Sequence, residues 1–388
     1  MIGSELPKGW DKVKLLDIAD LSTGKVDANH STEDGLYPFF TCASEPMKSP
    51  DYSFDDESVI VPGNGANVGC VLFYNGKFQA YQRTYVLSNI KIVPKYLYYH
   101  FLRYWKERTE NNQFGSATNY VKLINFANYI VDMPSFTDQK QIAEKLDKLF
   151  DQIETIKEAS NKIPELLKNF RQQVLTYAVT GKLIESTPEP RMLGELIDKL
   201  KYGTSKKADY DIEGFPVLRI PNINNGEIDS SDLKYVPLDD KEYNQLSLQE
   251  GDILVIRSNG SLSIVGQCAI VRKECENWVY AGYLIKIRCT HELLPEYLNY
   301  IFQSYQVRKQ IVEKSHSMSG VNNFSADKIK QLEIAWYPVE VQKQIVEKLN
   351  SIFGKLNEIE KQYNTLCEKL DKLPQTLLCK AFKGELNR

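Results

Sequence analysis

An octapeptide occurs twice in this chain with a single change, and this repeat constrains the fold more than any other feature. Residues 139–146 read QKQIAEKL and residues 342–349 read QKQIVEKL. The similarity continues without a gap over 139–183 and 342–386, which end in AVTGKL and AFKGEL. An ungapped register of this length favours a helix, because one inserted residue would rotate everything after it by about 100°. The sequence therefore predicts a duplicated helical segment.

Apolar residues recur in both copies at alternating steps of four and three residues. This 3.5-residue period is typical of a coiled-coil seam. Two ordinary surface helices are the alternative, although such helices rarely keep one seam over about five heptads. We expect the seam and the partner contacts of the helices at Ile142, Leu146, Leu149, Ile153, Ile156, Leu167, Phe170, Val174, Ile345, Leu349, Ile352, Leu356, Ile359, Leu366, Leu370 and Leu377.

Prolines and glycines punctuate the two helical copies. Pro164 and Pro374 lie inside them, so a kink or a break is expected at each. Gly181 and Gly384 follow the last apolar positions, where a left-handed residue would end a helix.

The segments before each helical copy also resemble one another. VPGNGANVGCVL (61–72) and VIRSNGSLSIVGQCAI (255–270) both indicate a hairpin with an Asn-Gly tip. Further along, each half shows a strand followed by a helix that opens with a proline, at Pro94 and at Pro295. The order of the chain is thus variable half, helix, variable half, helix.

This order predicts an α+β architecture of two α/β recognition domains separated by two long antiparallel coiled-coil helices, with a pseudo-two-fold internal repeat. The expected segments are 1–137 and 185–340 for the domains, and 138–184 and 341–388 for the helices. Two divergent domains held at a fixed separation suit a ligand with two features at fixed spacing, and double-stranded DNA is such a ligand.

The distribution of charge agrees with a nucleic-acid partner better than the net charge does. The net charge is −3, which gives no support to such a partner. However, residues 58–106, 214–226, 253–273 and 277–291 contain basic but no acidic residues. Each half could therefore present one basic face to phosphates, in the second half with Arg219, Arg257, Arg272, Lys273, Lys286 and Arg288. The alternative is that strands lack acidic residues for reasons of propensity alone.

Reading bases requires side chains with paired donors and acceptors, such as arginine for guanine and asparagine or glutamine for adenine. An Asn-Gly pair taken alone indicates only a turn, and a tyrosine taken alone indicates core packing, so the clustering of such residues carries the hypothesis. The candidate DNA-binding residues are Asn64, Asn67, Gln82, Arg83, Tyr85, Lys201, Tyr202, Lys206, Lys207, Arg219, Asn222, Arg257, Ser258, Asn259 and Tyr283.

No motif for catalysis stands out. The sequence lacks GxxxxGK[ST], GxGxxG after a strand, GxSxG, HExxH and an Asn/Asp-Pro-Pro-aromatic tetrad. Its seven cysteines form no CxxC pair and its four histidines are scattered, so neither a disulfide framework nor a metal site is expected. No apolar run reaches the roughly 18 residues of a membrane helix, and the first residues do not resemble a signal peptide. These features favour a non-catalytic protein of the cytoplasm that has no membrane partner.

The two helical copies resemble the two conserved regions of the specificity subunits of type I restriction–modification systems. FPVLRIPNINNGEID (215–229) and EGDILVIRSNGSLSIVGQCAIV (250–271) resemble recurrent segments of the target-recognition domains of that family. The resemblance covers essentially the whole chain, although the first half has ESVIVPG in place of GDILVIR.

The resemblance implies a subunit without catalytic activity, in which each domain reads one half of a split DNA site and the helices set the gap. It implies two methyltransferase subunits as partners, which bring S-adenosylmethionine, and it leaves open restriction subunits that use ATP and Mg²⁺. This chain itself would bind no cofactor. Two other hypotheses remain: the recognition part of a fused enzyme with its own restriction or methylation activity, and a coiled-coil scaffold without a role in DNA binding.

Overall fold

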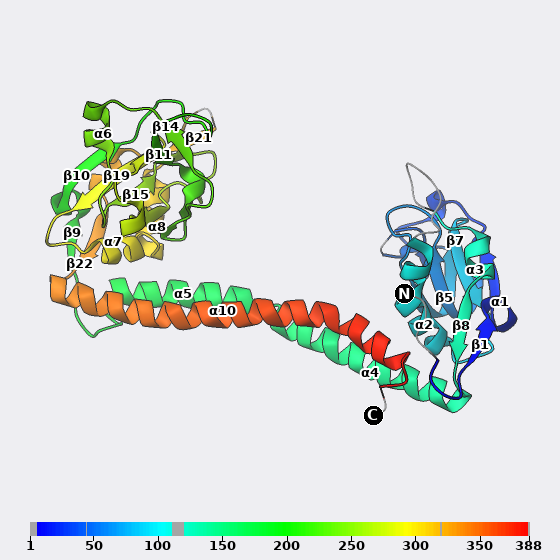
Figure 1. Ribbon diagram of the computed structural model, residues 1–388. Helices are drawn as coiled ribbons and strands as arrows, with labels where there is room; N and C mark the ends of the chain where they lie inside the picture. Colours follow the sequence, from blue (N-terminus) through cyan, green and yellow to red (C-terminus); the bar gives the residue numbers. More distant parts are fainter. Residues whose placement is uncertain (1–5, 44, 111–119, 319, 387–388) are drawn as a thin grey trace. The chain divides into compact units, whose positions relative to one another are not determined.

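The computed structural model describes residues 6–43, 45–110, 120–318 and 320–386. The chain divides into two compact units (Figure 1). Unit 1 contains Met1–Asn161 and Asn364–Arg388, and unit 2 contains Lys162–Tyr363. We call residues 6–133 domain 1 and residues 189–337 domain 2. No helix among the described residues is long and apolar enough to cross a membrane.

Domain 1 is built on a mixed sheet with helices on one face. The strands are β1 (Asp11–Lys14), β2 (Asp20–Thr23), β3 (Tyr37–Phe40), β4 (Met47–Ser49), β5 (Phe54–Pro62), β6 (Leu72–Ala80), β7 (Thr84–Ser88) and β8 (Ile130–Met133), and the helices are α1 (Leu15–Ile18), α2 (Pro94–Glu110) and α3 (Leu123–Ala127). The six-stranded sheet has the order β2-β7-β5-β6-β3-β4, and only the β3–β6 pair is parallel. β1 pairs separately with β8.

Both faces of the central strand β5 are buried, which explains its continuous apolar run. Val59 and Val61 pack into the core beneath α2, together with Trp105. Ile60 points to the opposite face and packs with Phe78. Successive side chains of a strand alternate between faces, so a strand covered on both sides shows no polar alternation.

Domain 2 repeats the central part of this plan. Its strands are β9 (Glu189–Met192), β10 (Ile197–Tyr202), β11 (Phe215–Leu218), β12 (Ile223–Asn224), β13 (Glu227–Ile228), β14 (Lys234–Val236), β15 (Ile253–Ile256), β16 (Ser258–Asn259), β17 (Cys268–Ile270), β18 (Val279–Tyr280), β19 (Leu284–Cys289), β20 (His316–Met318), β21 (Val321–Asn323) and β22 (Glu333–Trp336). Its helices are α6 (Asp240–Leu246), α7 (Pro295–Ile301), α8 (Tyr305–Lys314) and α9 (Ala326–Lys330). The sheet order β10-β19-β15-β17 matches β2-β7-β5-β6, and β9 pairs with β22 as β1 pairs with β8. The predicted hairpins and the proline-led helices α2 and α7 are confirmed.

The long helices pair antiparallel inside each unit. They are α4 (Phe136–Ser160), α5 (Ile163–Val179) and α10 (Val339–Ala381), and α10 belongs to both units. In unit 1, Lys157 pairs with Asp371 at 3.0 Å and Lys145 donates to the carbonyl of Leu386. In unit 2, Arg171 donates to Asn357, and Lys348 donates to the carbonyl of Leu183 at 3.1 Å. The contacts Lys145–Leu386 and Lys348–Leu183 join the same positions of the repeat, which explains why the end motifs are repeated as well.

The expected seam is buried at about half of its positions. Ile142, Leu146, Ile153, Val174, Ile345, Leu349, Leu356 and Leu370 are buried, and Leu149, Leu167, Ile352 and Leu377 are partly buried. Ile156, Phe170, Ile359 and Leu366 are 39–47% exposed. Each of these four side chains is therefore only partly covered within its own unit.

The two prolines behave differently. At Pro164 the break that the sequence predicted is confirmed, because α4 ends at Ser160 and α5 begins with the proline in its first turn. At Pro374 the helix does not break, since α10 runs through this residue to Ala381, and a kink at this position stays a prediction. Gly181 (φ +81°) and Gly384 (φ +71°) adopt the predicted left-handed conformation after the helix ends.

Candidate nucleic-acid interface

In domain 1, three chain segments meet where β5 ends. The backbone N–H of Gly63 donates to the carbonyl of Arg83 at 2.9 Å, and the N–H of Val121 donates to the carbonyl of Gly63 at 2.9 Å. A side chain on Gly63 would place its Cβ 2.3 Å from the Arg83 oxygen and about 3.0 Å from the Tyr85 ring. Glycine is therefore required for this close approach.

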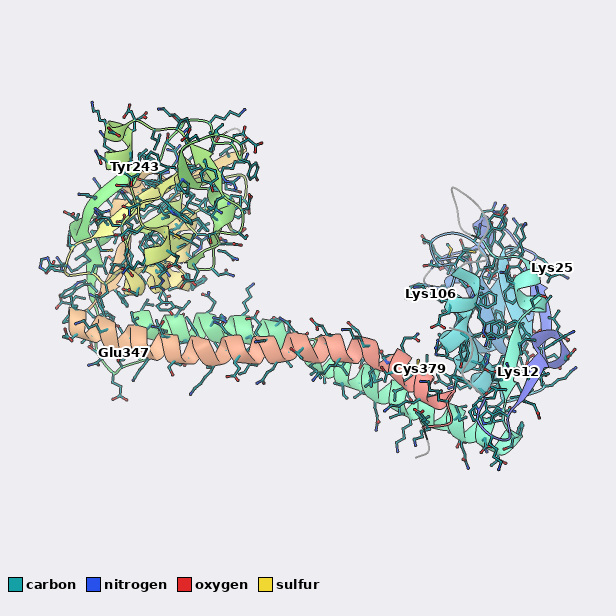
Figure 2. The ribbon with its side chains drawn as sticks, viewed as in Figure 1. Lys12, Lys25, Lys106, Tyr243, Glu347 and Cys379 are labelled. Carbon is teal, nitrogen blue, oxygen red and sulfur yellow. The ribbon has the colours of Figure 1, made fainter. Side chains whose placement is uncertain are left out.

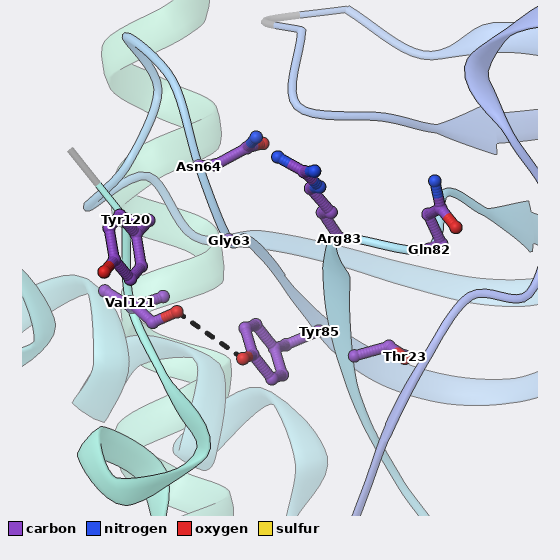
Figure 3. Close-up of a pocket in the computed structure, with 8 residues that line it drawn as sticks. All are labelled: Thr23, Gly63, Asn64, Gln82, Arg83, Tyr85, Tyr120 and Val121. Carbon is purple, nitrogen blue, oxygen red and sulfur yellow. Dashed lines mark hydrogen bonds between the residues drawn. The ribbon is translucent and has the colours of Figure 1, made fainter. Parts of the chain in front are cut away.

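A pocket of about 340 Å³ opens at this junction (Figure 3). Four of the predicted residues line it: Asn64, Gln82, Arg83 and Tyr85. The remaining lining residues, which the sequence analysis missed, are Thr23, Gly63, Tyr120 and Val121. Thr23 lies there because β2 pairs with β7 in a register that places it opposite Tyr85. Such a nonlocal register cannot be read from local patterns.

The polar side chains at the mouth of the pocket are available to a ligand. Gln82 and Arg83 are exposed and Asn64 is partly exposed. Figure 3 shows the Arg83 guanidinium and the Asn64 amide pointing toward one another across the opening. In the described part of the chain, no hydrogen bond or ion pair satisfies the side chains of these three residues. Deeper in the pocket, Tyr85 donates its hydroxyl to the carbonyl of Val121 at 3.5 Å, and burial raises the pKa of this tyrosine.

Domain 2 has the same backbone junction. The N–H of Arg257 donates to the carbonyl of Tyr283 at 2.9 Å, and the N–H of Phe324 donates to the carbonyl of Arg257 at 2.8 Å. Tyr202 lies opposite Ile285 as Thr23 lies opposite Tyr85. We call this shared arrangement the strand-end frame. It matches positions 23, 63, 64, 83 and 121 of domain 1 with positions 202, 257, 258, 283 and 324 of domain 2.

The matched positions carry different side chains. Arg257 replaces Gly63, and its guanidinium stacks 4.9 Å from the centre of the Tyr202 ring. The hydroxyl of Tyr202 in turn accepts a hydrogen bond from the N–H of Ala326 at 3.0 Å, which fixes the ring. Tyr283 stands where Arg83 stands in domain 1 and is 62% exposed. One backbone arrangement therefore presents two different sets of groups.

Asn222 is a correction to the candidate set. It is 1% exposed, and its amide nitrogen donates to the carbonyls of Asp229 (2.8 Å) and Asp232 (2.9 Å). Its oxygen accepts from the N–H of Arg219 at 2.8 Å. All of these bonds are internal, so Asn222 holds its loop together and does not reach a ligand. The sequence around Asn222 gave no sign that this side chain is buried.

Several other candidates already have partners inside the chain. Arg219 pairs with Asp232 at 2.9 Å, and Lys206 pairs with Glu242 at 2.6 Å. The remaining contacts are Lys201 to Gln245 (2.5 Å), Asn67 to the carbonyl of Cys42 (2.7 Å), and the N–H of Ser261 to Asn259 (2.9 Å), while Ser258 is 6% exposed. Lys207 is exposed. Most of these side chains therefore stabilise the loops of their own domain, because they already have partners there.

The basic face expected in domain 2 is smaller than the sequence suggested. Arg288 makes two hydrogen bonds of 2.7 Å to Asp252, a carboxylate that is 1% exposed. Lys286 donates to the carbonyl of Ser247 at 2.8 Å, and burial lowers its pKa to about 8. Asp252, which precedes the acid-free strand, thus pairs with both Arg288 and Lys286 and offsets one of their two positive charges. The sequence signal for this ion pair was the acidic residue Asp252 directly before the apolar strand β15.

Comparison with known proteins identifies the family. The pattern described as type I restriction modification DNA specificity domain matches residues 7–165 and 185–369. The chain belongs to this family. The resemblance noted from the helical copies and the loop segments is thereby confirmed.

Members of the specificity-domain family share moderate identity with this chain. The EcoKI specificity subunit of Escherichia coli strain K12 is 34% identical over 282 residues, which cover 70% of this chain and 61% of that protein. The EcoDI specificity subunit of Escherichia coli is 31% identical over 414 residues, which cover 100% of this chain and 90% of that protein. The match therefore spans less than two-thirds of the first relative and most of the second.

Solved structures show the same fold. A chain from a study of complex assembly and conformational transition of the type I R-M system has a TM-score of 0.76 at 16% identity, and the match covers 99% of this chain and 100% of that chain. The HsdS subunit from Thermoanaerobacter tengcongensis has a TM-score of 0.64 at 16% identity, with 99% of both chains covered.

Proposed function

We propose that this protein is the DNA specificity subunit of a type I restriction–modification complex. Each domain reads one half of a bipartite site in double-stranded DNA. The observation that carries this proposal is the strand-end frame, which the two domains share while its side chains differ. A common frame with variable side chains is suited to reading two unlike sequences with the same approach to DNA.

The paired helices are proposed to act as coiled coils that set the gap between the half-sites. The 43-residue helix α10 contributes residues to both units, so a change in its length is the proposed way to change this gap. The partly exposed apolar residues Ile156, Phe170, Ile359 and Leu366 are the proposed contacts for two methyltransferase subunits, with restriction subunits as further partners. Exposed apolar faces of this kind are typical of protein interfaces.

The chain is proposed to contribute recognition and no catalysis. S-adenosylmethionine would be bound by the methyltransferase subunits, and ATP and Mg²⁺ by restriction subunits. The membership of the specificity-domain family supports this division of work. The protein would act in the cytoplasm, where its DNA and its partner subunits are found.

A methylation map tests the proposal. The chain is co-expressed with its methyltransferase partner in a host without DNA methylation, and the genome is sequenced with detection of modified bases. We expect a two-part motif with a fixed gap, present only when this chain is present. Methylation that is identical without the chain would contradict the proposal, and methylation by the purified chain alone would favour the fused-enzyme hypothesis.

A further inference from the structure

Positions 83 and 283 hold the same place in the strand-end frame but carry chemically different side chains. Arg83 lies in the turn before β7, and Tyr283 lies in the turn before β19. The carbonyl of each residue accepts a hydrogen bond from the backbone N–H of the residue that follows β5 or β15. Arg83 is a cation with five donors, and Tyr283 is an aromatic ring with one hydroxyl. Both side chains are exposed. The backbone therefore presents a variable group at one fixed point of each domain.

Among the described residues, none pairs with the Arg83 guanidinium, so this group can bind a ligand. The pocket below it is open because residue 63 is a glycine, and the neighbouring groups Asn64 and Gln82 also carry both donors and acceptors. Arg219 and Arg288, by contrast, are paired with carboxylates. An unpaired arginine beside two amide side chains has the composition of a site that contacts the edges of bases.

We propose that positions 83 and 283 are equivalent base-reading positions of the two domains, and that Arg83 reads a guanine. This inference rests on the proposed function. Guanine is the only base that presents two acceptors, O6 and N7, side by side in the major groove, and the planar guanidinium matches them with two parallel N–H donors. Asn64 and Gln82 then flank this contact and face the neighbouring base or the sugar–phosphate backbone. A phosphate contact by Arg83 is the competing role, and it would carry no sequence information.

The test compares methylation maps of the wild-type complex with those of Arg83→Lys, Arg83→Gln and Tyr283→Ala. Lysine keeps the charge but loses the fork, and glutamine loses both. Arg83 is exposed, so these variants should fold, which thermal unfolding checks. Lys12→Gln is the matched control, because it removes one exposed positive charge from the same domain at β1 (Figure 2).

We expect both Arg83 variants to relax one guanine in one half-site, with the preference for guanine at that position falling at least about tenfold. Tyr283→Ala should change the other half-site only, and Lys12→Gln should leave both unchanged. A wild-type motif without guanine in the half-site that Arg83 affects would overturn the inference. So would an unchanged preference in Arg83→Gln, or a uniform loss of methylation that Arg83→Lys restores, which would indicate a phosphate contact. In each of these cases a wild-type bipartite motif would leave the proposed function standing, whereas its absence would remove the proposed function itself.

Discussion

The side-chain oxygen of Gln139 accepts a hydrogen bond from the backbone N–H of Val93 at 3.1 Å, just before α2 begins. The matched Gln342 accepts from the N–H of Leu294 at 2.8 Å, just before α7 begins. Both glutamines are buried, and both donate to the carbonyl that lies five residues before them in the chain. The glutamine that opens each copy of the repeated octapeptide therefore makes a polar contact between a domain and its long helix.

Replacing this glutamine should destabilise its unit. In Gln342→Leu, the N–H of Leu294 and the carbonyl of Tyr337 lose this partner, while the carbonyl of Glu292 keeps its bond from Trp336. We expect the free energy of unfolding to fall by about 2–4 kcal/mol, because buried groups would be left unsatisfied. Urea unfolding followed by circular dichroism measures this loss. The exposed neighbour Gln344→Leu is the control, and an equal effect of the two changes would contradict this role for Gln342.

Other polar residues of the repeated helices have other roles. Tyr99 donates to Asp147 at 2.6 Å, and the matched Tyr300 donates to Asn350 at 2.5 Å, so each domain is tied to its helix at a second point. Glu347, in contrast, is on the exposed face of α10 (Figure 2). The repeat thus preserves both residues with internal contacts and residues on the exposed face of the helices.

Phe382, near the end of the chain, should be essential for domain 1. It is 3% exposed and packs against the rings of Tyr96, His100 and Tyr104 at centroid distances of 5.2–5.7 Å. Phe382→Ala should lower the free energy of unfolding of unit 1 by about 3–5 kcal/mol, through lost burial and a cavity. Differential scanning calorimetry would show the shift. Leu366→Ala, at a 39% exposed position of the preceding helix α10, should have a much smaller effect.

The buried ring of His100 should make the stability of domain 1 depend on pH. The ring is fully buried, and burial lowers its pKa from 6.5 to about 4. Its Nε2 accepts the N–H of Asp132 at 3.1 Å, so the neutral ring carries its proton on Nδ1, which lies 3.0 Å from the hydroxyl of Tyr129. The folded state therefore excludes a proton that the unfolded state binds below pH 6.5.

The stability from His100 is fully present above pH 6.5 and is lost as the pH falls toward 4. Over this window the loss amounts to about 3 kcal/mol for this group. Urea unfolding at several pH values measures it, and His100→Gln should show a flatter profile between pH 6.5 and 4. A variant profile as steep as that of the wild type would show that other groups cause the pH dependence.

A substitution of Asn222 tests whether this residue stabilises its loop or reads a base. Asn222→Ala should lower the free energy of unfolding by about 1–3 kcal/mol, because the N–H of Arg219 and the carbonyl of Asp229 lose their partner. The carbonyl of Asp232 keeps only its bond from the Arg219 guanidinium. The methylated motif should keep its letters, since this side chain is buried. A changed base preference with unchanged stability would return Asn222 to the reading surface.

Local sequence patterns predicted the elements better than they predicted the sites. The ungapped repeat, the proline at the start of α5 and the left-handed Gly181 and Gly384 depend on neighbouring residues only, and these were found. The sequence could not decide between a kink and a break at Pro374, because tertiary packing can hold a helix together through one missing hydrogen bond.

Three of the site residues come together because β5 pairs with β7. Asn64, Gln82 and Arg83 come from adjacent strand ends, so their clustering was visible in the sequence. Thr23 joins them through the β2–β7 register, which is nonlocal. The burial of Lys286 and Arg288 beside Asp252 also depends on strand pairing, and acid-free stretches alone overstated the basic surface.

The most direct test of the account alters one domain at a time and reads both halves of the motif. Domain 1 is changed by Asn64→Ala with Gln82→Ala, and domain 2 by Arg257→Ala with Asn259→Ala, each followed by a methylation map of the assembled complex. We predict that each variant changes or abolishes the letters of one half-site, a different half for each, and that the gap stays the same. Changes in the same half-site for both variants, or a changed gap, would contradict the assignment of one half-site to each domain.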